Sequence, residues 1–366
     1  MKNFKTLILL TVISIGHLSN AKAMQLWQKI LPFVTADISY PLFTQLAQTL
    51  ALPGIEKLYI PCTTAALGYS YISYTWSNTY KTLRENSPAF YNQSNAKKTE
   101  QWIKDRFNKN KTITDLPILT IENGPEEARL VKDDTSQYLL QLSKKFSLQE
   151  KSIQKGLIAH EETHFSQNHH AKLKQNFIAA LTVTSLVITN IPAMDPDLYT
   201  LAGYYFCLPV YMANALETKL RRKLEKEADT FNKTPEELLG LIKLFTNTTN
   251  DNKKIADLLS SDNVENFAKK HFKERIPFFK KPFIDTSFPL TEERLTYLAL
   301  QLIKQINNPE PQDIPASLDE CKEALSCYFD SNQDYIADIP KINCPVVQKR
   351  VDFLRAKLIE LENKKA

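Results

Sequence analysis

Glycine is scarce in this chain, with seven residues among 366, whereas phenylalanine and tyrosine number 19 and 15. Long stretches are rich in leucine, lysine and glutamate, which have high helix propensity, so the composition favours a mainly helical protein. No motif recurs at a fixed spacing, which argues against a repeat architecture. A chain of this length buries a sizeable core and is long enough for two structural units.

A large excess of charge of one sign is also missing. The formal net charge is +5, but Lys2, Lys5 and Lys22 lie in an N-terminal leader that has no acidic residue. Without these three lysines the chain carries 43 basic and 41 acidic residues. No long basic patch is interleaved with aromatic residues, so we expect no nucleic acid among the partners.

The first 23 residues have the pattern of a secretory signal peptide. A lysine-containing start precedes an apolar run from Leu7 to Ile15, and Ala21-Lys22-Ala23 fits a small-x-small cleavage site. The same pattern also fits an uncleaved membrane anchor. In both cases we expect the chain to engage the membrane and to be exported, periplasmic or membrane-associated.

Cysteine is limited to five residues, and their spacings do not suit a zinc site with four protein ligands. Cys321, Cys327 and Cys344 cluster near the C-terminus, where two of them would be able to form a disulfide in an exported protein. Cys62 and Cys207 lie in apolar segments and are predicted to be small core residues.

We divide the rest of the chain into residues 24–110, 111–305 and 306–366. The first part is predicted to be helical and partly apolar, and its uncharged stretch at 58–76 is a candidate membrane segment. The second part holds the candidate catalytic motifs. The third contains a proline-rich linker and ends in an amphipathic helix, predicted to pack or self-associate through Val347, Val351, Leu354, Leu358 and Leu361.

The fold class expected from these patterns is mainly α with a small β element, or α+β. Two short apolar runs at 116–124 and 127–131, separated by a turn signal, predict a small hairpin or edge strands. Residues 148–175 keep one apolar face and predict a single helix. Further on, a charged helix is predicted to break near Thr234-Pro235 before another helix begins.

Two uncharged segments, residues 176–194 and 198–216, are separated only by a short acidic turn. They predict a membrane hairpin, with a buried hairpin as the alternative because Asn190, Pro192 and Pro209 dilute the apolar runs. The positive-inside rule places the flanking basic residues, and the candidate site beside them, in the cytoplasm. The leader predicts the opposite side, and we adopt export.

The strongest chemical signal is His160-Glu161-Glu162-Thr163-His164, an HExxH motif in a chain that has only six histidines. On a helix, residues i and i+4 share a face, so two imidazoles are able to bind one zinc ion. Glu161 lies beside them, where it is able to take a proton from a metal-bound water. We therefore expect one Zn²⁺ per chain, with His160 and His164 as ligands and Glu161 as the catalytic base.

A third protein ligand is expected from the later helix, which offers Glu225 and Glu227. Glu225 has Asp229 four residues on, on the same face, whereas Glu227 has Phe231 there. Metal-bound histidines usually donate their other N–H to a carboxylate. We therefore assign Glu225 as the ligand and Asp229 as the carboxylate that supports the ligands.

These motifs resemble the zinc metallopeptidases of the CAAX prenyl endopeptidase and HtpX-like family, which are membrane-associated gluzincins. The resemblance covers roughly residues 110–305: the HExxH motif, a further histidine at His169, an apolar hairpin at 176–216, and the sequence EKEAD at 225–229. It implies a gluzincin domain with the hairpin inserted between the HExxH helix and the third-ligand helix.

The chain departs from the family pattern at Phe288, where a histidine is expected before Pro289. In this family the downstream region is able to supply a group that steadies the oxyanion, and phenylalanine donates no hydrogen bond. Arg294, His271 and Tyr297 are the candidate oxyanion or structural residues. Removing one oxyanion donor typically slows catalysis about 10²–10³-fold.

The expected function is hydrolysis of peptide bonds by a zinc-dependent endopeptidase. The resemblance implies a polypeptide substrate that is exported, membrane-bound or misfolded, and the small β element is able to hold a peptide as an added strand. The alternatives are a catalytically weak, zinc-stabilised chaperone-like or binding protein, and a membrane scaffold with an incidental HExxH. Retention of Glu161 argues against the first, because structural zinc needs no general base.

Overall fold

The computed structural model describes residues 76–87, 96–108, 116–121, 128–132, 137–143, 146–189, 208–246, 252–272, 289–329 and 341–364. Contacts within the chain divide it into two units, residues 1–76 with 176–214 and residues 77–175 with 215–366. The signal-peptide prediction at 1–23, Cys62, Cys207 and Phe288 lie outside the described residues, as do all but the last residue of the candidate membrane segment at 58–76.

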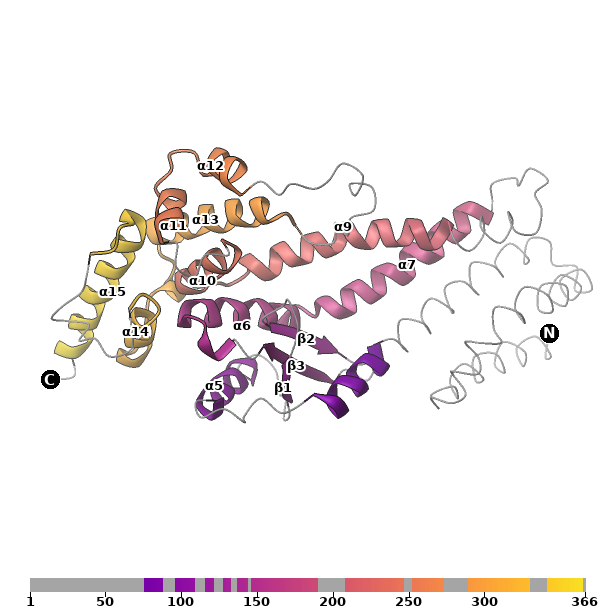
Figure 1. Cartoon of the computed structure of the whole chain (residues 1–366), viewed down its shortest axis with the longest axis horizontal. Helices are drawn as coiled ribbons and strands as arrows, with labels where there is room; N and C mark the ends of the chain where they lie inside the picture. The colour runs from indigo at the N-terminus through magenta and orange to yellow at the C-terminus, as the bar shows by residue number, and fades with distance from the viewer. Residues whose placement is uncertain are drawn as a thin grey trace, which may run out of the picture. The chain divides into compact units, whose positions relative to one another are not determined.

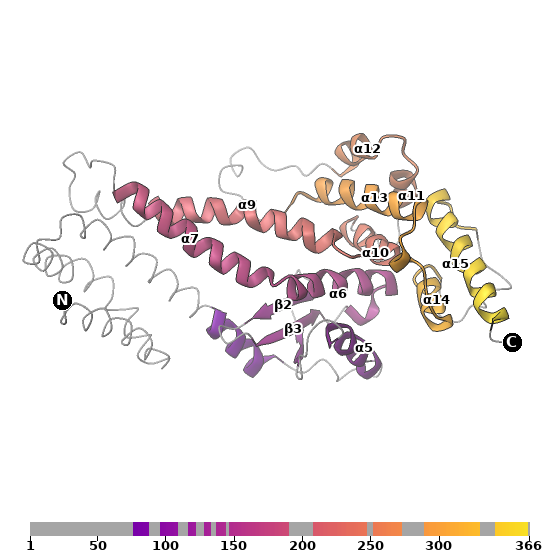
Figure 2. The same ribbon diagram turned by 180° about the vertical axis from the view of Figure 1, so that it is seen from behind.

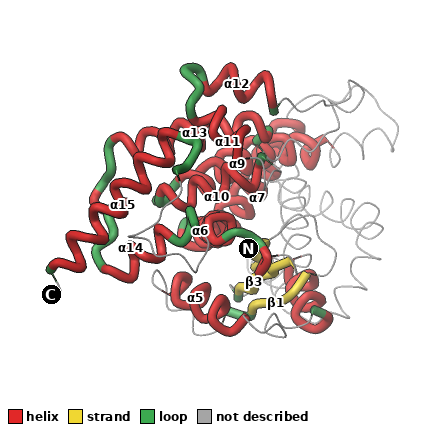
Figure 3. The backbone as a smooth tube through the Cα atoms, turned by 60° about the vertical axis from the view of Figure 1, so that its left-hand side comes forward, coloured by secondary structure: helices red, strands yellow, loops and turns green. Residues whose placement is uncertain are grey.

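Helices dominate the described part of the chain, and three short strands form its sheet (Figure 3). The predicted class, mainly α with a small β element, is therefore confirmed. Besides described helical residues at 76–86, the helices have these bounds: α5 Ala96–Asn108, α6 Lys151–Ser166, α7 His169–Thr189, α9 Leu208–Thr230, α10 Pro235–Phe245, α11 Asn252–Leu259, α12 Val264–His271, α13 Thr291–Asn307, α14 Leu318–Leu325 and α15 Pro345–Asn363. Short 3-10 turns lie at Phe146–Leu148 and Pro311–Asp313.

The sheet contains β1 (Ile118–Ile121), β2 (Ala128–Lys132) and β3 (Tyr138–Ser143) in the order β1-β3-β2. β1 runs parallel to β3, and β2 runs antiparallel to it with Leu130 opposite Leu140. Of the two predicted alternatives, the edge strands are therefore correct and the hairpin is wrong. The central strand was not predicted because its short apolar run has no clear alternation to distinguish it from a helix.

The larger unit is layered in the order sheet, α6, α10, α13 (Figures 1 and 2). One apolar core joins the sheet and α5 to α6, and a second joins α10 to α11, α12, α13 and the start of α15. Because α6 lies between these layers, both of its faces are covered and most of its residues are buried. The helix that carries HExxH is thus one of the most enclosed elements of the unit.

Two of the few glycines lie where α6 crosses α10. A Cβ at Gly156 would lie 2.7 Å from the carbonyl oxygen of Glu237, and one at Gly240 would lie 1.8 Å from that of Ser152. Both distances are too short for non-bonded atoms. The two backbones therefore touch at this crossing, which only residues without a side chain permit.

The predicted helix at 148–175 is two helices. α6 ends at Ser166, and Asn168 adopts a positive φ of 54° before α7 begins at His169. Asparagine tolerates this left-handed conformation better than most residues. By contrast, the break predicted near Thr234-Pro235 is confirmed, because Thr234 caps α10 and forms a capping box with Glu237.

The predicted membrane hairpin at 176–216 is wrong. None of the helices in the described ranges combines the length and the apolar character that a membrane crossing needs. The prediction of transmembrane helices is therefore wrong, and so is the membrane-associated location that was inferred from them. In the smaller unit, Phe177, Ala180 and Leu181 of α7 form a buried cluster with Ala213 of α9.

The C-terminal helix α15 packs against the rest of its own chain. Val347, Val351, Leu354 and Leu358 are buried, three of them against α14. Arg350 adds a buried bidentate ion pair with Glu236 of α10. The apolar stripe is thus used for intramolecular packing, one of its two predicted roles.

The three cysteines described near the C-terminus are free and buried, so the disulfide predicted among them is not formed. The thiol of Cys321 donates a hydrogen bond to the carbonyl of Leu354, and burial raises the pKa of this thiol to about 11. Cys327 has a similarly raised pKa, again because of burial. Such thiols are poor metal ligands and nucleophiles.

Candidate metal centre

The two histidines of the HExxH motif lie one turn apart on α6 and point at the same spot. The Nε2 atoms of His160 and His164 are 3.0 Å apart, and the rings meet edge to face. His160 is buried and His164 is half-buried. The periodicity of the helix creates this pair, and the packing of α6 between the sheet and α10 keeps it largely out of bulk water.

Glu225 of α9 completes a group of three ligand atoms. Its Oε2 lies 3.4 Å from His160 Nε2, and its Oε1 lies 3.6 Å from His164 Nε2. One ligand atom from each of the three residues fits within a span of 4.8 Å. Burial opposes ionisation of Glu225, but the hydrogen bonds and charges of the two histidines outweigh it and hold its pKa well below the ordinary value.

Asp229 lies one turn after Glu225 and contacts His160 from behind. Its Oδ1 is 2.9 Å from His160 Nδ1, the ring nitrogen that does not face the ligand group. The carboxylate is completely buried. Burial alone would raise its pKa, but the charge of Arg294 and the bond with His160 lower the pKa to about 2. Asp229 is therefore a charged acceptor that orients His160.

Arg294 and Tyr297 on α13 hold Asp229 in turn. The Nε and NH2 groups of Arg294 donate to the two oxygens of Asp229 at 2.9 and 2.6 Å, and the hydroxyl of Tyr297 also donates to it. The guanidinium of Arg294 also lies 3.9 Å above the ring of Phe245. The third candidate, His271, is not part of this group: it ends α12, is exposed, and stacks on Phe267.

Glu161 is buried between α6 and the sheet. Its Oε2 accepts a hydrogen bond of 2.7 Å from the backbone N–H of Leu130 on β2. Burial raises the pKa of Glu161, although the charges of His160 and His164 and the Leu130 bond offset part of this effect. A carboxylate with a raised pKa is better matched to proton transfer near neutral pH than an exposed one.

His169 contacts His164, one of the two motif histidines. The motif resemblance included His169 but did not indicate this partner. The two Nδ1 atoms are 2.9 Å apart, and His169 is completely buried. Burial, followed by the charge of His164, lowers the pKa of His169 to about 3, so its ring is neutral. His169 is the first residue of α7 and makes this contact across the break that the left-handed Asn168 introduces between α6 and α7.

A buried basic residue fixes α6 on its other side. The Nζ of Lys233 donates to the carbonyl of Ala159 at 2.6 Å and to the hydroxyl of Thr163. These two residues directly precede the two motif histidines. Burial lowers the pKa of Lys233 to about 8. Beside it, Arg106 of α5 pairs with Glu162 at 2.5 Å and with Glu237 at 2.6 Å, joining α5, α6 and α10.

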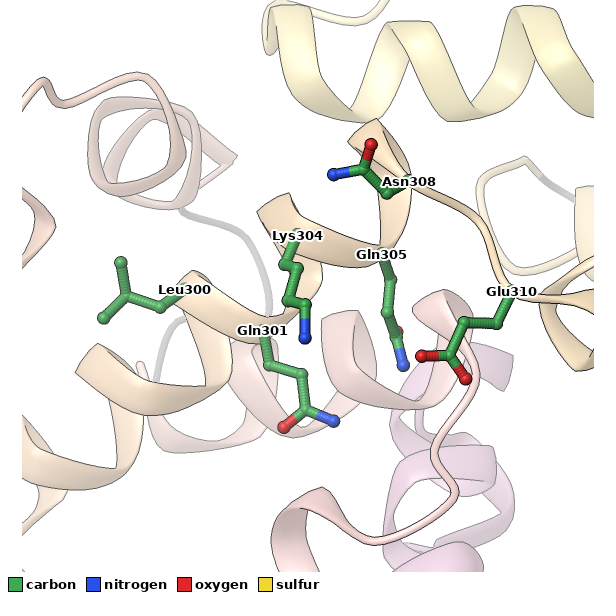
Figure 4. Close-up of a pocket in the computed structure, with 6 residues that line it drawn as sticks. All are labelled: Leu300, Gln301, Lys304, Gln305, Asn308 and Glu310. Atoms are coloured by element: carbon green, nitrogen blue, oxygen red, sulfur yellow. The ribbon is translucent and has the colours of Figure 1, made fainter.

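A separate surface pocket of about 410 Å³ lies on α13 (Figure 4), lined by Leu300, Gln301, Lys304, Gln305, Asn308 and Glu310. Gln301 and Gln305 donate to the carbonyls of Thr230 and Lys233. These two glutamines therefore hold the turn between α9 and α10 in place. The pocket is lined by none of the residues of the candidate metal site.

No protein-family model, curated protein or solved structure matches this chain. The motif resemblance to the CAAX prenyl endopeptidase and HtpX-like metallopeptidases therefore has no support from a matching family, and the geometry of the site is the basis for a functional assignment.

Proposed function

We propose that the protein is a zinc-dependent endopeptidase with a gluzincin-type site. The observation that carries the proposal is the convergence of His160, His164 and Glu225, with ligand atoms within 4.8 Å. Two imidazoles and one carboxylate suit Zn²⁺, and three protein ligands leave the fourth tetrahedral position for water. Structural zinc sites usually close that position with a fourth protein ligand, commonly cysteine.

The support around the ligands favours the same interpretation. Asp229 accepts the second N–H of His160, which fixes both the tautomer and the ring orientation needed for metal binding. Arg294 and Tyr297 are engaged with Asp229, so we assign them to positioning rather than to the oxyanion. Bound zinc would supply a water of lowered pKa and a positive charge for the oxyanion.

Glu161 then acts as general base and proton shuttle. It takes a proton from the attacking water, and it delivers that proton to the leaving amine when the peptide bond breaks. Its raised pKa suits both steps. Its carboxylate also accepts a hydrogen bond from the backbone N–H of Leu130, which holds it in place.

The position of β2 favours a polypeptide substrate. β2 is an edge strand, and the Leu130 N–H points out of the sheet to Glu161 rather than to β3. A peptide added as a strand beside β2 would bring its scissile carbonyl next to the catalytic base. This arrangement favours cleavage within a chain.

The test is a zinc assay and a casein digestion on the wild type and on Glu161→Gln. We expect about one zinc ion per chain in both proteins, with proteolysis only in the wild type, because the variant keeps the ligands and loses the base. Zinc-binding protein without proteolysis in either form would favour the chaperone-like alternative. Absence of zinc from the wild type would contradict the proposed site.

A further inference from the structure

The imidazole of His164 is held from behind by a second histidine. Its Nε2 faces His160 and Glu225, and its Nδ1 lies 2.9 Å from Nδ1 of His169. The two nitrogens of an imidazole lie on different edges of the ring. His169 therefore contacts the edge of His164 that faces away from the ligand group, and it is not placed as a fourth ligand.

The tautomers of this pair follow from the proposed zinc site. A metal ligand at Nε2 of His164 must carry its proton on Nδ1. That N–H then donates to Nδ1 of His169, which accepts only if the proton of His169 is on Nε2. A hydrogen bond between two Nδ1 atoms thus sets the proton positions on both rings.

The outer nitrogen of His169 faces a carboxylate. Its Nε2 has no partner within hydrogen-bond distance, and Oε2 of Glu227 on α9 lies 3.7 Å away. His169 is completely buried, whereas the Glu227 side chain is 30% exposed. Glu227 therefore has room for the small movement that would make this contact a hydrogen bond.

We infer that His169, backed by Glu227, is a positioning residue that orients His164 for metal binding. The inference rests on the proposed function, since it concerns the same zinc site. It gives each histidine ligand its own support: His160 is held by Asp229, and His164 by His169. The acidic helix α9 then serves both ligands, through Asp229 on one face and Glu227 on another.

The test compares His169→Phe with His169→Asn. Phenylalanine fills the space without an acceptor, whereas the side-chain oxygen of asparagine, at the same bond count as Nδ1, is able to accept from His164. We expect His169→Phe to weaken zinc binding about 10–100-fold in a chelator competition, and His169→Asn to recover most of that loss. The absorption bands of the Co²⁺-substituted protein should change in His169→Phe and return toward wild type in His169→Asn.

Two further variants keep the test decisive. Glu227→Gln at a partly exposed position should fold normally and weaken zinc binding by about tenfold, the lower end of such effects. His170→Asn, at the neighbouring position of α7, is the matched control and should leave the zinc affinity near that of the wild type. Wild-type affinity and Co²⁺ bands in both His169→Phe and Glu227→Gln would overturn the inference while leaving the site intact. A wild type that binds no zinc would instead contradict the proposed function.

Discussion

At the scale of single residues, the three carboxylates near the C-terminal end of α9 have different environments. Glu225 contacts both motif histidines, Asp229 contacts His160 and Arg294, and Glu227 contacts His169. Glu225 and Glu227 differ by about 200° around the helix, which is why only one of them reaches the ligand group. The spacing of acids along α9 thus gives each a different set of partners, with His160 shared by Glu225 and Asp229.

We therefore expect zinc affinity to fall in a fixed order among alanine variants of α9. Glu225→Ala removes a ligand and should lose zinc almost completely, as should His160→Ala and His164→Ala. Asp229→Ala should cost about 10–100-fold and Glu227→Ala less. Equilibrium dialysis of each variant measures this order, with Glu217→Ala, upstream on the same helix, as the control. If Glu227→Ala were the most damaging, the ligand assignment would have to move.

Arg294 compensates a buried charge, and its loss should be costly. Arg294→Gln leaves the buried carboxylate of Asp229 without its bidentate partner, and breaking such pairs typically costs about 3–5 kcal/mol. The exposed pair Arg222–Glu293 joins the same two helices, so Arg222→Gln is a matched control and should cost under about 1 kcal/mol. Urea unfolding measures both. Equal effects of the two variants would show that burial of Asp229 does not matter.

At the scale of elements, the crossing of α6 and α10 sets the depth at which the motif lies. Gly156 and Gly240 let the two helices touch, and Lys233 then donates to the Ala159 carbonyl and the Thr163 hydroxyl of α6, beside the two motif histidines. Tight packing here limits the freedom of the ligand pair. Glycine is otherwise unfavourable inside helices, so its presence at the crossing has a steric reason.

Gly240→Ala should destabilise the protein although alanine is the better helix former. A Cβ at this position would collide with the backbone of Ser152, and a comparable overpacked site typically costs about 1–3 kcal/mol. Thermal unfolding of the metal-free protein measures the change. A gain of about 0.5–1 kcal/mol, the amount helix propensity alone predicts, would show that the crossing is loose.

At the scale of the whole molecule, the metal-free site carries a pH signature. Burial opposes protonation of His160, but its bonds to Asp229 and Glu225 raise its pKa from 6.5 to about 9. The folded chain then holds a proton that the unfolded chain releases above about pH 6.5. Stability from this group is complete below that pH and is lost as pH rises through 9.

We expect the metal-free protein to lose stability between about pH 6.5 and 8. His169 and His170, whose pKa values burial lowers to about 3, act with the opposite sign below that window, and Lys233 does so above about pH 8. Urea unfolding at several pH values measures the slope, and His160→Asn should flatten it. Since zinc replaces the proton on His160, the stabilisation that zinc adds should grow over the same range. A slope of opposite sign in the wild type would contradict the proposed environment of His160.

Much of the local structure follows from short-range rules in the sequence. The pairing of His160 and His164 needs only a helical period, and the cap at Thr234 needs only a threonine, a proline and a glutamate at the right spacing. Glu225 was distinguishable from Glu227 because only one of them has an acid four residues on. These features depend on neighbours within one or two helical turns, which a single sequence displays directly.

The hydropathy of residues 176–216, considered by itself, led to a wrong prediction. The absence of charge predicted a membrane hairpin, but none of the described helices is long and apolar enough for a membrane crossing. The single helix predicted at 148–175 is also wrong, because one left-handed residue, Asn168, separates α6 from α7 just before His169. Composition does not report the φ angle of one residue.

The sequence by itself determined a mainly helical chain with an HExxH helix, an acidic partner helix and two strands, because each depends on local periodicity. Only the tertiary structure decided what stands behind the ligands. Arg294 and Tyr297 lie more than 60 residues from Asp229 in the sequence and donate to its carboxylate, Glu161 accepts from the backbone of β2, and His169 contacts His164 across the break between α6 and α7. Such contacts depend on how layers of helices and sheet stack to bury their apolar faces, and no local pattern encodes that stacking.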